Sequence, residues 1–490
     1  MESYIIGIDV GTSGTKALLL CGGEVAGSAS AEYQPDYPQD GYSEQDPNVW
    51  WEAVIAAVTG LLEKYPMAKG KVAALACSGQ MHSSVFLDSQ GYVVRKALLW
   101  NDTRTTKQVA YLNETVGAER FLEYTQNRAL EGFTLPKILW LRDNEPENFA
   151  RTVKVVLPKD YINYMLTGVL ATEFSDAAGS AAFNVRERRF CRELLMEIGL
   201  DESLFPPVLQ STAVVGTLLP AVAAHLGLSP DTKVVAGGAD NSCAAVGNGI
   251  TKAGQAVISL GTSGTVVAML DNLRGNITGD VHLFNYSHPG AYYAMGVMLS
   301  AGACLEWYRS VSGYDRFRVM DGEAGAAEPG SRGVVFLPYL AGERCPSNPH
   351  ARGVFFGLSN LSGKAEMARA VMEGVAYSFR FMLELVEGFT GITELYITGG
   401  GAKSAVWRQI VADITGRELA VLNNTEGPSL GAAIIAGVGA GVYRSFDEAK
   451  GLLLSKELTV TPTKHDAYER GYSLFRKLYA ALCPLFAEAR

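Results

Sequence analysis

Two aspartates stand at strand-like runs of apolar residues, where an acid could act on a ligand. Asp9 lies in "GIDVGTSGTKALLL" just before a turn, and Asp240 ends the run "TKVVAGGAD" before a helix-like segment. Sheets of α/β proteins present ligands at the carboxyl ends of their strands, so Asp240 is placed to accept a proton from a hydroxyl. Asp9 could hold a metal ion through water. A helix N-cap with no part in chemistry is the alternative for Asp240.

The pentapeptide GTSGT occurs twice, at 11–15 and 261–265, each time between apolar, strand-like residues. Small residues in such a turn let backbone N–H groups approach a phosphate, and the first copy adds Thr12, Ser13 and Lys16 as candidate ligands. Neither copy is a Walker loop, because the sequence contains no GxxxxGK[ST]. One copy alone would favour an ordinary exposed turn. Two copies at equivalent places favour paired phosphate loops on either side of a nucleotide.

Two further strand ends carry candidate ligand contacts. In "SGQMHSS", His82 could donate to a polyol hydroxyl while Met81 packs on the carbon chain, although a lone histidine often has a structural role instead. "ITGGGAKSAVWRQ" places three glycines, 399–401, between a strand and a helix, which permits close approach of the backbone to a base or ribose. His282 and His288 have no accompanying ligand pattern and are expected to be structural.

The elements that must position these residues occur in the same order in both halves of the chain. A strand, a turn and a strand over 4–20 precede a helix that starts at Pro47 after an Asp46 cap, and then a strand over 72–78. The second half repeats a strand, turn and strand over 255–270 before further strands and helices. This order predicts alternating strands and helices in two related α/β units.

Length and repetition together predict two domains. At 490 residues the chain exceeds the size at which one hydrophobic core stops growing. We expect an N-terminal domain over 1–247 with the polyol contacts Met81 and His82, the first phosphate loop and Asp240 as the base. We expect a C-terminal domain over 248–490 with the nucleotide site and the second phosphate loop. A hinge at 247–254 would let the two domains close and exclude water.

Composition and charge exclude several classes of partner. The net charge is −9 without a basic tract, which argues against nucleic acid. Seven scattered cysteines without a CxxC are typical of a reducing compartment. "MESYIIGID" lacks the basic residues of a secretory signal, and the apolar stretch 428–443 is too short and Gly-rich to span a membrane. We expect a cytoplasmic protein with no membrane partner.

Longer segments make the sequence similar to a known family. "GFTLPKILWLRDN" (132–144) and "GVFFGLSNLSGKAEMARAVME" (353–373) match the two signatures of the FGGY carbohydrate kinases. "LWNDTR", "LPKDY", "SDAAG", "GGADN", "LPYLAGER" and "TGGGA" follow in the order of that family. The chain therefore resembles these kinases over nearly its whole length. The resemblance implies an α/β fold of two ribonuclease-H-like domains, of the actin and hexokinase type, around a central cleft that binds ATP and a sugar.

The resemblance also implies residue roles. Asp240 would be the general base toward the sugar hydroxyl, and Asp9 would be a second catalytic residue that holds Mg²⁺ near the phosphates of ATP. Because Leu260 directly precedes the second GTSGT copy, metal chemistry is expected at the first copy alone. The implied contacts are, for the sugar, Met81, His82, Asn101, Asp102, Asp240 and Asn241; for the phosphates, Thr12, Ser13, Lys16, Gly261, Thr262 and Ser263; and, for the nucleoside, Gly302, Gly400, Gly401 and Ala402.

The activity implied by the resemblance is ATP-dependent phosphorylation of D-xylulose at its terminal hydroxyl, in pentose catabolism. "QMH" favours this ketose over a glycerol-type substrate. Ser83, "SDAAGS" and Cys345 depart from the commoner family pattern, and Ser83 lies beside the sugar contacts. L-Ribulose, gluconate or another polyol therefore stay open as substrates, as does an actin-like ATPase that phosphorylates no sugar. The family also makes a homodimer one expected assembly.

Overall fold

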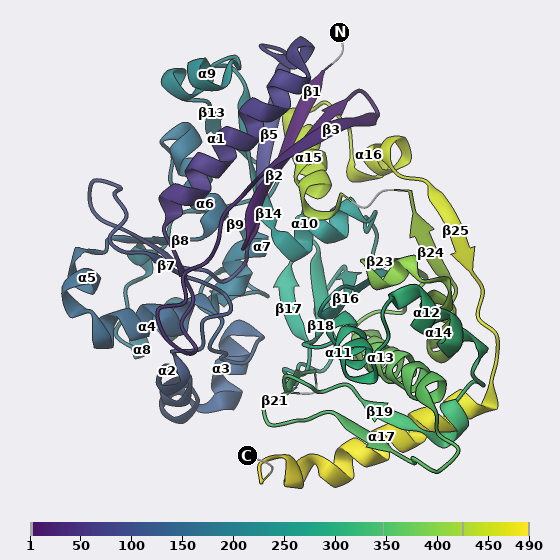
Figure 1. The fold of residues 1–490 in the computed structure, drawn as a ribbon. Helices are drawn as coiled ribbons and strands as arrows, with labels where there is room; N and C mark the ends of the chain where they lie inside the picture. Colours follow the sequence, from purple (N-terminus) through teal and green to yellow (C-terminus); the bar gives the residue numbers. More distant parts are fainter. Residues whose placement is uncertain (1–2, 346, 424–425, 489–490) are drawn as a thin grey trace.

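The computed structural model describes residues 3–345, 347–423 and 426–488, and two β-sheets form its centre (Figure 1). The first sheet has the order β13-β14-β5-β1-β2-β3. Its strands are β1 (Tyr4–Val10), β2 (Gly14–Cys21), β3 (Glu24–Glu32), β5 (Val72–Gly79), β13 (Val214–Thr217) and β14 (Lys233–Ala239). The hairpin predicted over 4–20 and the strand predicted over 72–78 are confirmed.

The second sheet has the order β17-β18-β16-β15-β23-β24-β25. Its strands are β15 (Gln255–Leu260), β16 (Gly264–Leu270), β17 (His282–Asn285), β18 (Tyr292–Met298), β23 (Glu394–Thr398), β24 (Leu419–Leu422) and β25 (Lys456–Val460). In each sheet an antiparallel meander of three strands continues into two parallel strands: β3-β2-β1-β5-β14 in the first and β18-β16-β15-β23-β24 in the second. This shared order is the predicted pair of ribonuclease-H-like units.

The helix α1 (Pro47–Lys64) covers one face of the first sheet. It begins where the sequence predicts, because the Asp46 carboxylate accepts a hydrogen bond from the Asn48 amide at 3.0 Å. Its buried face includes Trp50, Val54 and Val58, and the helix packs on β2 and β3. Apolar residues at helical spacing thus explain both the element and its place on the sheet.

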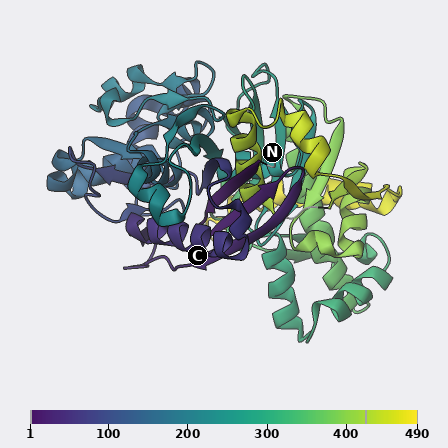
Figure 2. The same ribbon diagram turned by 90° about the horizontal axis from the view of Figure 1, so that it is seen from above.

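The helix α15 (Gly427–Ala440) covers the opposite face of the first sheet although it comes from the far end of the chain. It packs against β1, β5, β14 and α10 (Asp240–Gly247). A Cβ on Gly7 would overlap the backbone of Ser429, so the helix lies directly on β1. In Figures 1 and 2 this yellow-green helix lies beside the purple strands. Residues near the C-terminus therefore complete the first core, and the boundary at 247 stays a prediction.

The remaining helices fall into two stretches of the chain. Between β5 and β14 the chain forms α2 (Thr106–Tyr111), α3 (Ala118–Thr125), α4 (Thr134–Asn144), α5 (Pro146–Arg151), α6 (Pro158–Thr167), α7 (Phe174–Ala177), α8 (Arg192–Glu197) and α9 (Pro220–Leu226). Of these, α2 to α5 and α8 lie in a group beside the first sheet (Figure 1). The second half forms α11 (Gly302–Ser312), α12 (Phe317–Ala326), α13 (Lys364–Glu387), α14 (Ala405–Thr415), α16 (Phe446–Leu453) and α17 (Asp466–Phe486).

The helices and the cysteines bear on the expected absence of a membrane span and of disulfides. Among the described residues, no helix is long and apolar enough to cross a membrane. All seven cysteines lie in described segments, and each is a free thiol.

Candidate active site

The first GTSGT copy forms a tight turn between β1 and β2, and side chains from other parts of the chain hold it through hydrogen bonds. The Gly11 amide donates to the Gly14 carbonyl at 3.0 Å, and the Tyr33 hydroxyl donates to the Gly11 carbonyl at 2.7 Å. Gln45 Nε2 donates to the Thr12 carbonyl at 2.9 Å. These bonds occupy the carbonyl groups of the turn and fix its shape. The exposed part of the turn is left to its small side chains.

Trp100 links this turn to the predicted sugar contacts, and sequence reasoning assigned it no role. Its indole Nε1 donates to Thr12 Oγ1 at 2.9 Å, and its backbone amide donates to Ser83 Oγ at 3.0 Å. Ser83 directly follows His82 in the sequence. The indole is 37% exposed, which is high for a tryptophan. The only sequence signal was its place in "LWNDTR".

The second GTSGT copy forms the turn between β15 and β16, and the start of α11 lies on it. The Gly261 amide donates to the Ser263 carbonyl at 3.1 Å, and the Gly302 amide donates to the Gly261 carbonyl at 2.8 Å. The Ala301 amide donates to the Thr262 carbonyl at 2.9 Å. A Cβ on Gly302 would lie 2.6 Å from the Gly261 oxygen, so only glycine fits there. The side chains of Thr262 and Ser263 remain exposed.

Asp240 follows β14 as the first residue of α10, with its carboxylate partly exposed. The cap position belongs to Ala239, and the Asp240 carboxylate instead accepts hydrogen bonds from Asn241, from the amide at 2.6 Å and from Nδ2 at 2.9 Å. The alternative of a helix N-cap is therefore wrong. The predicted contact Asn241 lies beside the predicted base and orients it.

Asp9 and Asp240 are brought close enough to perturb each other. Burial, and then the negative charge of Asp9, raise the pKa of Asp240 to about 7, against hydrogen bonds from Asn241 and the Met81 amide that lower it. Burial also raises the pKa of Asp9 to about 6, although Ser78 and Lys16 oppose the shift. Asp9 on β1 and Asp240 after β14 lie on the two strands that flank β5. Two carboxyl groups with pKa values raised toward neutral pH in one site are typical of a catalytic centre.

His82 lies at this strand end in a strained backbone conformation, with φ at +68°. Its Nδ1 is 2.6 Å from the Gly179 carbonyl, and burial holds its pKa well below the usual range. Because a carbonyl only accepts, Nδ1 carries the proton of the neutral ring and Nε2 is left as an acceptor. This tautomer favours Nε2 as an acceptor over the predicted donation to a sugar hydroxyl, and the contact with a sugar stays a prediction.

Met81 is buried between the two halves of the molecule. Its Sδ lies 3.6 Å from Asn241 Nδ2 and 3.7 Å from the Tyr293 hydroxyl, which comes from β18 of the second sheet. The structure thus brings Met81, His82, Asp240 and Asn241 together at the carboxyl ends of β5 and β14. Their contact with a sugar stays a prediction.

The other two predicted sugar contacts differ from each other. Asp102 is fully buried, and its oxygens accept hydrogen bonds from the Ser43 amide at 2.7 Å and from the Arg104 guanidinium at 2.7 to 2.9 Å. These bonds favour a structural role for Asp102. Asn101 Oδ1 is buried and has no hydrogen-bond partner among the described residues. Of the two, Asn101 therefore keeps an acceptor that a ligand could use.

Lys16 points toward the second half of the molecule and pairs with Glu426 at the start of α15. Its predicted contact with a phosphate would compete with this ion pair. The charge therefore lies between the first turn and the helix that covers the first sheet, and its role toward a nucleotide stays a prediction.

The three glycines after β23 have different surroundings. A Cβ on Gly399, where φ is +99°, would lie 2.6 Å from the Leu260 oxygen, and one on Gly401 would lie 2.6 Å from Leu260 Cγ. Gly400 is exposed and has open space around it. A hollow of about 300 Å³ lies beside this turn, with Ala402 in its lining. The turn therefore packs tightly on β15 and presents Gly400 outward, as a nucleoside contact requires.

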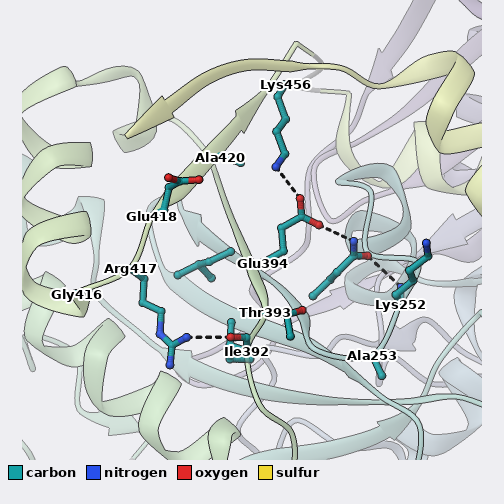
Figure 3. Close-up of a pocket in the computed structure, with 12 residues that line it drawn as sticks. Lys252, Ala253, Ile392, Thr393, Glu394, Gly416, Arg417, Glu418, Ala420 and Lys456 are labelled. Atoms are coloured by element: carbon teal, nitrogen blue, oxygen red, sulfur yellow. Dashed lines mark hydrogen bonds and ion pairs between the residues drawn. The ribbon is translucent and has the colours of Figure 1, made fainter. Parts of the chain in front are cut away.

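A second hollow, of about 660 Å³, lies away from these residues (Figure 3). It is lined at the amino ends of β15 and β23, where Gln255 Nε2 donates to Glu394 at 2.7 Å and Lys456 pairs with Glu394 at 2.7 Å. Arg417 donates to the Ile392 carbonyl at 2.9 Å. Glu394 is thus occupied by Gln255 and Lys456. Ligands of α/β sheets bind at the opposite strand ends.

Comparison with known proteins decides the family. Residues 4–247 match the N-terminal domain of the FGGY family of carbohydrate kinases, and residues 256–440 match its C-terminal domain. The chain belongs to the FGGY family of carbohydrate kinases. The resemblance drawn from the sequence motifs is confirmed, and so is the kinase class.

Relatives and solved structures cover this FGGY kinase almost completely. The xylulose kinase of Staphylococcus xylosus is 38% identical over 483 residues, which are 97% of this chain and 100% of that protein. A xyloylose kinase structure from Brucella ovis has a TM-score of 0.93 at 35% identity, with 98% of this chain and 100% of that chain covered. A gluconate kinase structure from Lactobacillus acidophilus has a TM-score of 0.94 at 27% identity, with 100% of both chains covered. The predicted two-unit fold is thereby confirmed.

In this FGGY kinase the first signature segment contacts the backbone of the predicted sugar contact His82. Lys137 of α4 is fully buried, and its Nζ donates to the His82 carbonyl at 3.0 Å and to the Gly132 carbonyl at 2.6 Å. Thr134 Oγ1 donates to the same His82 carbonyl at 3.1 Å. These bonds hold His82 in its left-handed conformation. Sequence reasoning used the segment as a family match and missed this role.

Proposed function

We propose that this kinase transfers the γ-phosphoryl group of ATP to the terminal hydroxyl of D-xylulose, giving D-xylulose 5-phosphate. The observation that carries the proposal is Asp240, a partly exposed carboxylate at the end of β14 with its pKa raised to about 7, beside Met81 and His82. The xylulose kinases to which the chain is similar along its whole length support this choice of sugar.

Asp240 is the proposed general base. Its ionised carboxylate would accept the proton of the sugar hydroxyl as that oxygen attacks the phosphorus atom. A base with a pKa near the working pH combines enough of the ionised form with enough basicity. Asn241 would keep one carboxylate oxygen in place, which leaves the other oxygen for the hydroxyl.

His82 and Met81 are the proposed contacts to the ketose. The free Nε2 of His82 would accept a hydrogen bond from a sugar hydroxyl, and the thioether of Met81 would pack against the carbon chain. The bonds from Thr134 and Lys137 to the His82 carbonyl fix the ring before the sugar arrives. A fixed acceptor of this kind orients a polyol with little loss of entropy.

The two GTSGT turns are the proposed phosphate sites, and the glycine turn after β23 is the proposed nucleoside site. Transfer of a phosphoryl group needs mostly positioning and neutralisation of charge. Mg²⁺ in such sites is bound by one or two carboxylates and by the phosphates themselves. Asp9 fits that pattern as a single partly exposed carboxylate on the strand before the first turn. When bound, the ion would neutralise charge on the phosphates.

Gluconate is a second candidate substrate. The gluconate kinase from Lactobacillus acidophilus has nearly the same fold as this chain. Burial is the main cause of the lowered pKa of the His82 imidazole, and the charge of Arg344 adds to it, so a cation for a sugar acid is present near the site. D-Xylulose is preferred because full-length similarity to xylulose kinases reaches higher identity.

A coupled ADP-release assay over ketoses, polyols and aldonates tests the substrate. We expect the highest kcat/KM for D-xylulose, and a higher value for gluconate or L-ribulose would overturn the sugar assignment. ADP release that no sugar accelerates would instead favour an actin-like ATPase. Asp240→Ala should lower turnover by about 10² to 10⁴-fold.

Location and assembly stand as further proposals. We place the enzyme in the cytoplasm, where ATP is plentiful and thiols stay reduced, in keeping with its seven free cysteines. A homodimer stays a prediction.

A further inference from the structure

A cluster of buried charges lies behind the proposed catalytic base. Lys159 is fully buried in α6, and its Nζ lies 2.5 Å from Asp160, 3.6 Å from Glu173 and 3.5 Å from Asp176. The three carboxylates are also buried. Burial raises the pKa of Asp176 well above its usual range although the charge of Lys159 opposes the shift, and the negative charges of the neighbouring acids, Asp240 among them, raise it further.

Such a cluster is a poor stabiliser. Removing charges from water costs several kcal/mol per ion, and well-packed apolar residues are often as stable in their place. Both oxygens of Asp176 lack a hydrogen-bond partner among the described residues, so hydrogen bonds offset only part of the free-energy cost of burying it. Stability therefore does not explain why these buried charges are present. The hydrogen bonds of the cluster indicate a role in the proposed active site.

The hydrogen bonds run from the cluster to the residue before the catalytic base. Glu173 accepts bonds from the Ser175 amide and from Ser175 Oγ, each at 2.8 Å. Ser175 Oγ in turn accepts the backbone amide of Ala239 at 3.0 Å. Ala239 is the last residue of β14 and the cap of α10, and Asp240 follows it. One buried hydroxyl thus joins the charged cluster to the point where strand becomes helix.

The same segment also reaches the sugar contacts. Four residues after Ser175, the Gly179 carbonyl accepts the hydrogen bond of His82 Nδ1 at 2.6 Å. A Cβ on Gly179 would lie 2.9 Å from His82 Nδ1 and 2.9 Å from Met81 Cε. Residues 173–179 therefore contact both sides of the site: the base through Ser175 and the sugar contacts through Gly179.

We propose that Ser175 is a positioning residue, which holds Ala239 and so sets the distance between the Asp240 carboxylate and the attacking hydroxyl. Glu173, fixed by Lys159, orients the hydroxyl of Ser175 so that its lone pair faces the Ala239 amide. This role rests on the proposed function of Asp240 as the base. Ser175 itself contacts neither sugar nor ATP in this scheme.

Ser211 provides a matched control for Ser175. Its hydroxyl is buried and donates to the same carboxylate, at 2.5 Å from Glu173 Oε2. Within the described part of the chain, its side chain bonds to no residue of β14 or α10, and only its backbone carbonyl does, by accepting the Gly237 amide at 3.1 Å. Ser175→Ala and Ser211→Ala therefore each remove one buried hydroxyl from Glu173, but only the first removes the acceptor of the Ala239 amide.

The test compares steady-state kinetics of the two full-length variants with the parent enzyme. For Ser175→Ala we expect kcat to fall by about 10 to 100-fold, since a misplacement of about 1 Å can cost that much, with the KM for ATP within about twofold of the parent. Ser211→Ala should keep kcat within about twofold. Hydrogen exchange of peptides over 233–246 should be faster in Ser175→Ala alone, and Ser175→Thr, which keeps the hydroxyl, should recover kcat.

Three outcomes would overturn the inference: an unchanged kcat in Ser175→Ala, equal losses of kcat in both alanine variants, or equal exchange over 233–246 in both. Asp240→Ala separates this failure from failure of the proposed function. An inactive Asp240→Ala beside a normal Ser175→Ala removes only the positioning role. A nearly normal Asp240→Ala removes the base assignment itself.

Discussion

At the scale of single residues, identical sequence forms two different turns. The Gly11 amide donates to the carbonyl of Gly14, whereas the Gly261 amide donates to the carbonyl of Ser263, so the second turn closes one residue earlier. Strand pairing differs in the same way at the ends of the two hairpins. The pentapeptide predicts that a turn forms. The length of the second turn also depends on the Gly302 amide, which donates a hydrogen bond to the Gly261 carbonyl.

Ionisation of Asp240 should control the rate at low pH. The carboxylate must be ionised to accept a proton, and its pKa is raised to about 7 by burial and by Asp9. We expect kcat/KM for the sugar to be constant above this pH and to fall about tenfold per unit below it. A pH series at saturating ATP, with coupling enzymes checked at each pH, measures the profile. A flat profile between pH 6 and 8 would contradict the assignment.

The same raised pKa predicts a gain of stability on neutralising the residue. An acid whose folded pKa exceeds its unfolded value destabilises the folded state as pH rises from about 4 to about 7. Asp240→Asn, which keeps the acceptor for Asn241, should therefore raise the unfolding free energy at pH 8 by about 1 to 2 kcal/mol, reduced by the partial exposure of the site. Denaturant unfolding at pH 8 and pH 4.5 measures it. A gain that does not shrink at pH 4.5 would argue against the cause given.

At the scale of elements, the start of α11 fixes the second turn. A Cβ on Gly302 would lie 2.6 Å from the Gly261 oxygen, and backbone cannot move away as a flexible side chain could. Gly261 and Gly302 are about 40 residues apart in sequence, so no local sequence pattern predicts their contact.

Gly302→Ala should therefore act on nucleotide binding. We expect the KM for ATP to rise by about 5 to 20-fold, roughly 1 to 2 kcal/mol, while the KM for the sugar changes little. Gly322→Ala is the matched control, because this glycine lies inside α12 with open space around it and the change should be neutral or slightly stabilising. Equal effects of both substitutions on the KM for ATP would contradict the role of this contact.

At the scale of the whole molecule, periodicity and motifs predicted much of the architecture. The strand before each turn, the capped helix α1, and the repeated order of strands are local patterns, and they were found where expected. The packing of α15 on the first sheet and the bonds from Lys137 to His82 were missed, because each joins residues distant in sequence. The same limit explains why Asp102, which its segment placed near the sugar, has its oxygens filled by Ser43 and Arg104.

The place of α15 predicts the behaviour of a truncated chain. A protein comprising residues 1–247 contains every strand of the first sheet but lacks the helix that covers β1, β5 and β14. We expect it to bind a hydrophobic dye strongly and to unfold without a cooperative transition. The full-length protein should bind little dye and unfold cooperatively. A truncated chain with a sharp unfolding transition and no dye binding would contradict this prediction.

The far position of α15 also has a consequence during protein synthesis. The strands of the first sheet leave the ribosome well before Gly427 is added, and at about 5 to 20 residues per second the intervening segment takes on the order of 10 to 40 seconds to make. One apolar face of the nascent sheet is uncovered throughout that interval. We therefore expect chaperones to engage this chain while it is being translated, and their release to depend on the synthesis of α15.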